Sequence, residues 1–535
     1  MSARTPLPLG RMGGPRPVVG GRRHRDLLRD LLGGLIPLIV GLAITIAVPH
    51  PNPLLIFGLI LGAAGIVVLL VSRRYEISVA ILAIYLGMLD GPVKLESASK
   101  ASSGVRDVLI LAVVLGMLMR LVTSKQRVLL PPLSAWVIAF GAFVLAEAFN
   151  PHTLSILKSI GGWRQQLEWV PFFFFGYTVI RSKERFRRLF MLLGVIALAN
   201  GLVGTVQAKI SPASLASWGP GYAGIVHGGE EGSGITGRTY KSGGVTHARP
   251  PALGSDSGFG GGIGVIALPG LLALLAADRS RRRWPAVICA LGALLGIATA
   301  ASRTSIVSAV VVLLTFGLLS VFSGIKIGRA FVVLVAVLTL SLGVGAALIA
   351  ANGSGIFARQ ESLTSVSSVQ EHGASAKERN LAEIPTDLVH APFGFGLGVA
   401  GSASGFGGHS KLEFEGERVT GGSAYSLLMK ELGAPGLLLW IGFTLNVILL
   451  AGMRMRRVRD QELRIYLLGA LVAFLALTVQ GFSGPTLAVT TGAFLWFVPG
   501  VISYWFAGEG SVEALAPAEQ DGAGRRPRTP TAVPA

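Results

Sequence analysis

Long apolar runs recur along the whole chain, separated by short polar segments. A helix needs about 20 apolar residues to cross the hydrocarbon core of a bilayer, and helices satisfy their own backbone hydrogen bonds there. Of the 535 residues, 51% are apolar and only 14% are charged. The mean hydropathy is +0.63, whereas soluble domains carry about 25% charged residues. The sequence therefore predicts an all-α polytopic membrane protein.

The apolar runs predict about fourteen transmembrane helices, with a long outer loop before the third-last one. The candidate spans are residues 31–48, 53–71, 77–89, 108–119, 133–149, 170–180, 190–208, 259–277, 286–300, 304–322, 331–351, 432–451, 465–479 and 486–506. Two shorter polar segments, residues 90–106 and 150–168, are expected in loops on the outer side.

Basic residues fall mainly in every second loop. The clusters lie in residues 73–74, 120–127, 181–188, 278–283, 326–329 and 454–464. Lys and Arg are enriched in cytoplasmic loops, so both termini are predicted to be cytoplasmic. The net charge of +19 is explained by this bias, which argues against nucleic-acid binding.

This topology divides the chain into seven parts. They are a basic cytoplasmic head (1–30), an N-terminal transmembrane bundle (31–208), a glycine-rich outer loop (209–258), transmembrane helices with a Ser-Arg hairpin (259–351), a large outer loop (352–431), C-terminal transmembrane helices (432–506) and a disordered cytoplasmic tail (507–535). A polar interval as long as 352–431 between two spans indicates a functional loop.

Several arginines on the predicted outer face run against the charge bias. Arg303 lies in a tight hairpin between two apolar runs, Arg249 precedes a span, and Arg379 lies in the large loop. The planar guanidinium suits phosphate oxygens. The alternative is an arginine that snorkels to the lipid headgroups. The spans contain almost no internal charge, which argues against an ion-coupled transporter.

Two residues could serve as a general base. Glu431 lies where the large loop re-enters the membrane, and partial loss of water would make its carboxylate a stronger base. The alternative is that Glu431 pairs with Lys430 or an arginine at the rim. His409 lies in a glycine-rich run and is the second candidate. No phosphate-binding loop or D-x-D element occurs, so no metal or other cofactor is expected.

Three segments together resemble the O-antigen ligase and O-antigen polymerase family of bacterial membrane glycosyltransferases. They are the hairpin Thr299-Ala300-Ala301-Ser302-Arg303, Arg379 with the later turn Pro392-Phe393-Gly394-Phe395-Gly396-Leu397-Gly398, and the re-entry segment from Tyr425 through Glu431 and Gly433 to Gly436. The segment from Arg249 to Gly260 is a weaker fourth likeness.

The resemblance implies transfer or polymerisation of a glycan from an undecaprenyl pyrophosphate carrier onto an acceptor glycan or lipid. The reaction would take place at the outer face of the bacterial plasma membrane, with arginines on the pyrophosphate and Tyr425 near the substrate. One departure is that Gly422 and Ser423 stand where the ligases often have His-Asn. This favours a polymerase-like or otherwise divergent member, or a base supplied from elsewhere, such as His409 or Glu431.

Two other functions compete with this one. A non-catalytic lipid-glycan transporter or flippase would need polar residues along a path through both halves of the membrane, whereas the polar groups gather at one face. A structural or scaffold membrane protein would leave Arg303 and the turn from Gly394 to Gly398 unexplained.

Overall fold

The computed structural model describes residues 66, 69, 75–97, 100–124, 130–153, 155–227, 239–242, 245–256, 258–277, 283–325, 374–404 and 422–515. The chain divides into a smaller unit, Met1–Arg74 with Val108–Leu129, and a larger unit, Tyr75–Asp107 with Leu130–Ala535. Apart from His409, which lies outside the described residues, every candidate site residue lies in the described part of the larger unit.

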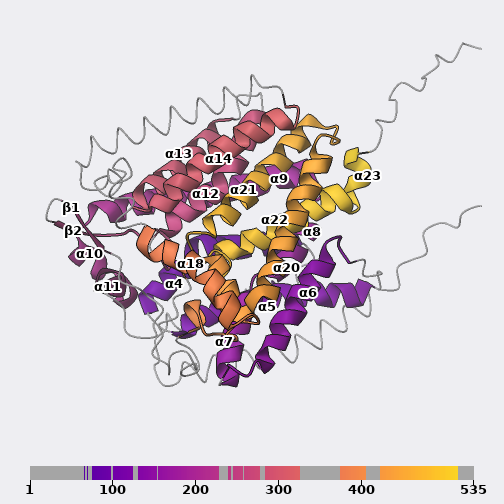
Figure 1. The fold of residues 1–535 in the computed structure, drawn as a ribbon. Helices are drawn as coiled ribbons and strands as arrows, with labels where there is room; N and C mark the ends of the chain where they lie inside the picture. The colour runs from indigo at the N-terminus through magenta and orange to yellow at the C-terminus, as the bar shows by residue number, and fades with distance from the viewer. Residues whose placement is uncertain are drawn as a thin grey trace, which may run out of the picture. The chain divides into compact units, whose positions relative to one another are not determined.

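Long apolar helices dominate the described residues (Figure 1). Six are long and apolar enough to cross a membrane: the continuous segment Tyr75–Glu96, α9 (Lys183–Lys209), α12 (Phe259–Ala277), α14 (Arg303–Phe322), α20 (Ala424–Met455) and α21 (Gln461–Gln480). Shorter apolar helices are α6 (Ser134–Ala146, extended by η2, Glu147–Phe149), α13 (Trp284–Thr299) and α22 (Thr491–Ala507). The predicted multi-pass helical class is confirmed.

The count of fourteen spans stays a prediction. The candidate spans at 31–48, 53–71 and 331–351 lie wholly or almost wholly outside the described residues. The candidate at 170–180 is α8 (Pro171–Val179), a helix of 9 residues, too short to cross a bilayer alone. The candidate at 108–119 lies within α5 (Lys100–Ser124).

Helix α12 forms the centre of the larger unit. It packs against α9, α13, α14 and α21. Within an 18-residue apolar stretch of this helix, 89% of the residues are buried. Glycines let its neighbours approach closely: a Cβ atom at Gly264 would lie 2.6 Å from the carbonyl oxygen of Ala293 in α13. A helix that is apolar on every side is expected at such a buried position.

The helices of this bundle have two chemically different ends. At the basic end, α9 begins beside α21, with Lys183 Nζ 2.7 Å from Asp460 Oδ2. At the opposite end, called here the hairpin end, Gln207 near the end of α9 donates to the carbonyl of Ala252 at 3.1 Å. There α20 also begins against the end of α21, since the amide of Ala424 donates to the carbonyl of Gly481 at 2.8 Å.

Several segments predicted as loops contain ordered elements. The segment 209–258 holds α10 (Pro212–Ala216), α11 (Pro220–His227) and an antiparallel hairpin of β1 (Thr239–Ser242) and β2 (Val245–Ala248). The segment 352–431 holds α18 (Ala374–His390) and η4 (Gly401–Ala403). The tail 507–535 begins with α23 (Gly510–Leu515), where Ala514 is buried.

Two outer segments are also helical, contrary to the prediction of loops. The segment 90–106 contains α4 (Asp90–Ser97) and the start of α5, and the segment 150–168 contains α7 (Ile156–Leu167). Hydropathy patterns miss such helices because their buried side chains are polar and are paired by distant parts of the chain.

Candidate functional site

The polar side chains of α7 face the protein interior. The hydroxyl of Ser155 caps the helix by accepting a hydrogen bond from the amide of Leu157 at 3.3 Å. Lys158, Gln165 and Gln166 are all buried. Residues seven or eight apart share one face of a helix, so these three side chains are directed at the same neighbouring elements.

The two glutamines of α7 hold the carboxylate of Glu431. Gln166 Nε2 donates to Glu431 Oε2 at 2.6 Å, and Gln165 Nε2 donates to Oε1 at 3.0 Å. The amide of Gly398 donates to the same Oε1 at 3.1 Å. Glu431 has no exposed surface. Three donors compensate for the loss of water, which a buried carboxylate requires.

The turn at residues 394–404 fits between α7 and α20 because of its glycines. Four of them adopt positive φ angles: Gly394 (81°), Gly396 (89°), Gly398 (75°) and Gly401 (70°). A residue with a Cβ atom rarely adopts this region. At Gly398 a Cβ atom would also lie 2.4 Å from the carbonyl oxygen of Lys158. The alternating glycines seen in the sequence therefore have a steric reason.

Helix α20 is broken two residues after Glu431. Gly433 has φ 62° and ψ −163° and lies inside the helix that spans Ala424–Met455. The break lets the backbone pair with the turn: the amide of Ala434 donates to the carbonyl of Pro392 at 2.8 Å, and the amide of Phe395 donates to that of Lys430 at 2.7 Å. The re-entry segment and the glycine turn, both singled out in the sequence, thus pack directly on each other.

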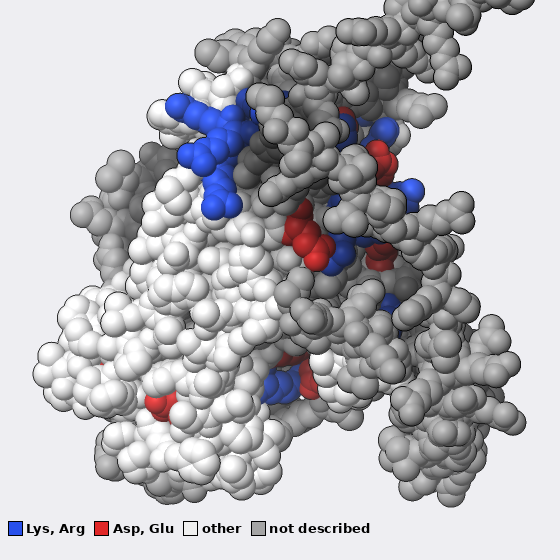
Figure 2. Space-filling view, turned by 90° about the vertical axis from the view of Figure 1, so that its right-hand side faces the viewer, with Lys and Arg blue, Asp and Glu red and all other residues white. Residues whose placement is uncertain are grey.

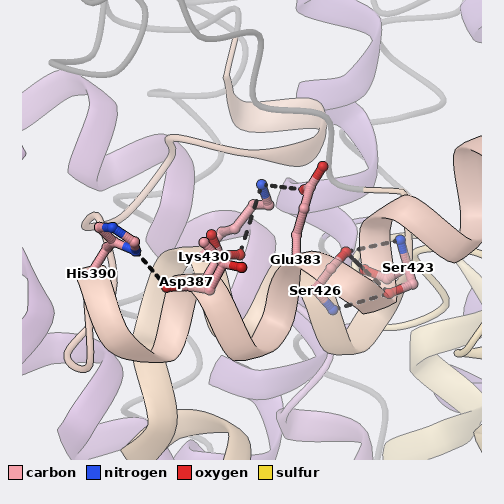
Figure 3. A network of polar contacts seen from close by, with 7 residues as sticks. Glu383, Asp387, His390, Ser423, Ser426 and Lys430 are labelled. Carbon is pink, nitrogen blue, oxygen red and sulfur yellow. Dashed lines mark hydrogen bonds and ion pairs between the residues drawn. The ribbon is translucent and has the colours of Figure 1, made fainter.

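Ion pairs join α18 to the same part of α20 (Figure 3). Lys430 Nζ lies 2.9 Å from Glu383 Oε2 and 3.8 Å from Asp387 Oδ2. Ser423 and Ser426 form a capping box at the start of α20. The alternative in which Glu431 pairs with Lys430 is therefore not seen. The side chain of Lys430 contacts α18, whereas that of Glu431 contacts α7.

Lys158 contacts the last residue of the turn. Its side chain is fully buried, and Nζ donates to the carbonyl of Ser404 at 2.9 Å. Gln165 Oε1 in turn accepts from the hydroxyl of Ser402 at 2.8 Å and from the amide of Ala403 at 3.0 Å. The polar face of α7 therefore binds the C-terminal end of the turn as well as Glu431.

Arg303 and Arg249 both lie at the hairpin end. Arg303 is the first residue of α14, after a turn in which Ala301 has φ 47°. The segment that follows Arg249 packs against this turn, since a Cβ atom at Gly258 would lie 3.8 Å from Ser302 Cβ. Neither arginine is among the hydrogen-bond partners of Glu431.

The remaining candidates are placed differently. Arg379 belongs to α18, on the turn before Glu383. His409 lies outside the described residues. Tyr425 is buried at the start of α20, its hydroxyl donates to the carbonyl of Thr478 at 3.0 Å, and its ring centroid lies 4.4 Å from that of Phe482. The phenol is thus fixed to the end of α21.

A second charged cluster lies at the C-terminal end of α7. Arg106 makes two contacts with Glu168, Nε to Oε1 at 2.6 Å and Nη2 to Oε2 at 3.0 Å. Its guanidinium also lies 3.7 Å from Asp90 Oδ2 and stacks 5.2 Å from the ring of Trp169. Burial raises the pKa of Glu168 to about 7, although Arg106 acts in the opposite direction. This cluster fixes the start of α5 to the end of α7.

The sequence identified Glu431 but none of its side-chain partners. A signal was present: Lys158, Gln165 and Gln166 are spaced along one helical face in a segment with Gly161 and Gly162 between them. Small residues on a polar helical face indicate close approach to another backbone. At Gly162 a Cβ atom would lie 2.5 Å from the amide nitrogen of Gly398.

No model of a protein family and no curated protein matches the chain. The likeness to O-antigen ligases and polymerases thus rests on the three segments quoted from the sequence, and the function of the site is a proposal.

Proposed function

We propose that the chain is a membrane glycosyltransferase. It would transfer or polymerise a glycan from undecaprenyl pyrophosphate onto an acceptor glycan or lipid, at the outer face of the bacterial plasma membrane. The observation that carries the proposal is the packing of the re-entry segment on the glycine turn through Glu431 and Gly398. These are two of the three segments of the resemblance, and the hairpin with Arg303 begins α14 at the same end of the bundle.

The proposed chemistry needs cations beside the leaving group. An acceptor hydroxyl attacks the anomeric carbon, the bond from that carbon to the pyrophosphate oxygen breaks, and the leaving pyrophosphate takes the bonding electrons. Fixed positive charge beside this oxygen lowers the barrier. Arg303 and Arg379 are the proposed pyrophosphate ligands, with Arg249 as a third, and the ring of Tyr425 is a proposed substrate contact.

The proton of the acceptor hydroxyl must go to a base within hydrogen-bond reach. Glu431 and His409 are the two candidates. The Glu431 carboxylate accepts three hydrogen bonds and has no exposed surface, so an acceptor hydroxyl would reach it only if one of the surrounding elements moved. The Gln166→Leu variant keeps the carboxylate but removes one donor, so it separates a base from a residue that only positions the turn.

Transfer activity of the purified chain tests the proposal. The assay uses a lipid-pyrophosphate-linked glycan and an acceptor glycan, with a chelator present and no nucleotide sugar. Arg303→Ala should lower the rate by about 10²-fold, as the loss of one charge-stabilising donor does elsewhere. Arg303→Lys should still transfer glycan at least about tenfold more slowly than the parent, because lysine lacks the planar guanidinium group with its paired N–H donors. Arg188→Ala, at an exposed position near the start of α9, is the matched control.

Several outcomes would contradict the proposal. If Arg303→Ala and Arg379→Ala both retain full activity at normal expression, the assigned site is wrong. Movement of the lipid-linked glycan across vesicles without any product would favour the transporter. If Glu431→Gln is fully active and His409→Ala is inactive, His409 is the base. If Gln166→Leu is as inactive as Glu431→Gln, Glu431 acts by positioning the turn.

A further inference from the structure

A groove opens at the basic end, where the ends of α14 and α20 meet the start of α21. Its volume is ≈ 200 Å³. The walls are apolar and include Leu319 of α14, Met455 of α20 and Leu468 of α21, while Arg456 lines the groove at the end of α20. The groove lies far along the helices from the proposed glycosyltransferase site, because α14 and α20 both run from the hairpin end to the basic end.

Gly452 keeps this groove open. It lines the groove, it is exposed, and a Cβ atom built on it would meet no other atom within 4 Å. Most other glycines of the helix bundle are in tight contact with a neighbouring helix, so close packing does not explain the small residue here. The space above Gly452 is available to a ligand.

The groove continues into the apolar outer surface of the helices. Phe322 lines the groove and is 56% exposed, and Leu318, one turn earlier in α14, is 59% exposed. On α20, Leu449 and Met453 are 57% and 65% exposed. Side chains of this kind on a membrane-crossing helix are solvated by acyl chains. A hydrocarbon chain can therefore pass from the bilayer into the groove without crossing a polar barrier.

Positive charge gathers at the mouth of the groove. Four arginines, Arg454, Arg456, Arg457 and Arg459, fall within six consecutive residues. Figure 2 shows Lys and Arg side chains at the top of one face, above a broad surface of uncharged residues. The nearest carboxylates in sequence, those of Asp460 and Glu462, contact Lys183 at 2.7 and 3.2 Å, which leaves the arginine cluster positively charged.

Two of the basic side chains are held in place by backbone carbonyls. Arg456 Nε donates to the carbonyl of Phe322, and Arg464 Nη1 donates to that of Ser323 at 3.1 Å. A simpler interpretation is that both arginines only cap the C-terminus of α14. That contact uses one N–H group of Arg456, however, and a guanidinium has five. Capping also does not explain the open apolar groove beside it.

We propose that this groove binds an anionic phospholipid from the membrane leaflet around the basic end. Arg456 donates to the phosphate, Arg464 adds positive charge behind it, and one acyl chain lies over Gly452 between Phe322 and Met455. Basic pockets between transmembrane helices bind anionic headgroups in this way, and guanidinium–phosphate hydrogen bonds are strong. The proposal is independent of the glycosyltransferase function.

Native mass spectrometry of the full chain in detergent tests this site. Phosphatidylglycerol and phosphatidylcholine with identical acyl chains are the two probes. The parent chain should retain phosphatidylglycerol more tightly, and Arg456→Gln should weaken this binding by about tenfold, the effect of losing one charge-assisted hydrogen bond. Gly452→Leu should weaken the binding of both lipids, since its side chain fills the groove. All variants are first compared by thermal unfolding.

Two matched variants serve as controls. Arg457→Gln removes the same charge one residue away, outside the groove lining. Gly141→Leu adds the same side chain to α6 at another position with no atom within 4 Å. Both should bind phosphatidylglycerol within about twofold of the parent. Equal losses in Arg456→Gln and Arg457→Gln would indicate a diffuse basic surface and overturn the site. Parent-like binding by Gly452→Leu, or equal affinity of the parent for the two lipids, would also overturn it.

Discussion

Glu431 shows how one side chain can organise three elements. Its two oxygens accept hydrogen bonds from two glutamines of α7 and from the turn at Gly398. The sequence placed a carboxylate at the point of re-entry, but it could not supply the partners, because these lie 265 and 266 residues away. The interaction depends on tertiary packing, which no local pattern encodes.

Glu431→Gln should destabilise the fold. An amide at this position presents an NH₂ group to donors that need an acceptor, and a buried unsatisfied donor costs about 1–3 kcal/mol. The apparent melting temperature of the purified protein should therefore fall by several degrees. Glu383→Gln changes the same chemistry at a half-exposed ion pair and should have little effect. Equal melting temperatures for the parent and Glu431→Gln would show that the three hydrogen bonds contribute nothing.

Arg106→Gln should also destabilise the fold, by about 3–5 kcal/mol, because it leaves the buried carboxylate of Glu168 without its cation. Arg106 lowers the pKa of Glu168, while burial raises it from 4.5 to about 7 in the parent. In the variant this pKa should rise further. A folded-state pKa above the unfolded value gives stability that is complete below the unfolded pKa and is lost as pH rises through the folded one.

The loss of melting temperature in Arg106→Gln relative to the parent should therefore be larger at about pH 8 than at about pH 5.5. Thermal unfolding at the two pH values measures this difference, with Arg188→Gln at an exposed position as the control. If the difference in melting temperature between Arg106→Gln and the parent were the same at both pH values, Glu168 would not titrate in this range.

At the scale of elements, the sequence predicted apolar helices well and polar ones poorly. The bounds 259–277 coincide with α12, and 304–322 differs from α14 by one residue. In contrast, α7 was expected to be a loop, and α20 begins at Ala424 rather than at 432. Lys430 and Glu431 lie just before the predicted apolar run, but Lys430 is ion-paired and Glu431 is hydrogen-bonded, so the helix already includes both residues before Gly433 breaks it.

The glycine turn offers a test at this scale. Gly398→Ala should destabilise the protein and abolish the proposed activity, because its φ of 75° is unfavourable for alanine and the new Cβ atom would lie 2.4 Å from the Lys158 carbonyl oxygen. Gly484→Ala is the matched control, since a Cβ atom there meets nothing within 4 Å. Melting temperature and glycan transfer should stay at parent values in the control. A Gly398→Ala protein with unchanged stability would show that the turn can shift freely.

For the whole molecule, the alternating basic loops predict which end of the bundle faces the cytoplasm. Helix α9 runs from Lys183 at the basic end to Lys209 at the hairpin end, so α10, which follows it, marks the opposite side from the basic loop between α20 and α21. The number of spans could not be obtained in the same way, because short apolar segments such as α8 satisfy a composition rule without the length to cross a bilayer.

Cysteine labelling in intact cells tests this orientation. Cys289, the single cysteine of the chain, is buried and can be replaced by serine as the background. A cysteine at the exposed position Ser214 in α10 should react with an impermeant maleimide, whereas one at Arg457 should react only after lysis. The reverse pattern would place the proposed glycan site in the cytoplasm.

The long separation between α7 and Glu431 also has a consequence for biosynthesis. Gln166 leaves the ribosome 265 residues before Glu431, and at about 5–20 residues per second this interval lasts on the order of 10–50 s. Throughout that time the polar face of α7 has no carboxylate to bind, although its helix is already being placed among apolar segments. Until residues 398–404 and Glu431 have been made, Lys158, Gln165 and Gln166 lack the partners that they have in the folded chain, and we expect water or lipid headgroups to satisfy them, which favours a position of α7 at the membrane surface during synthesis.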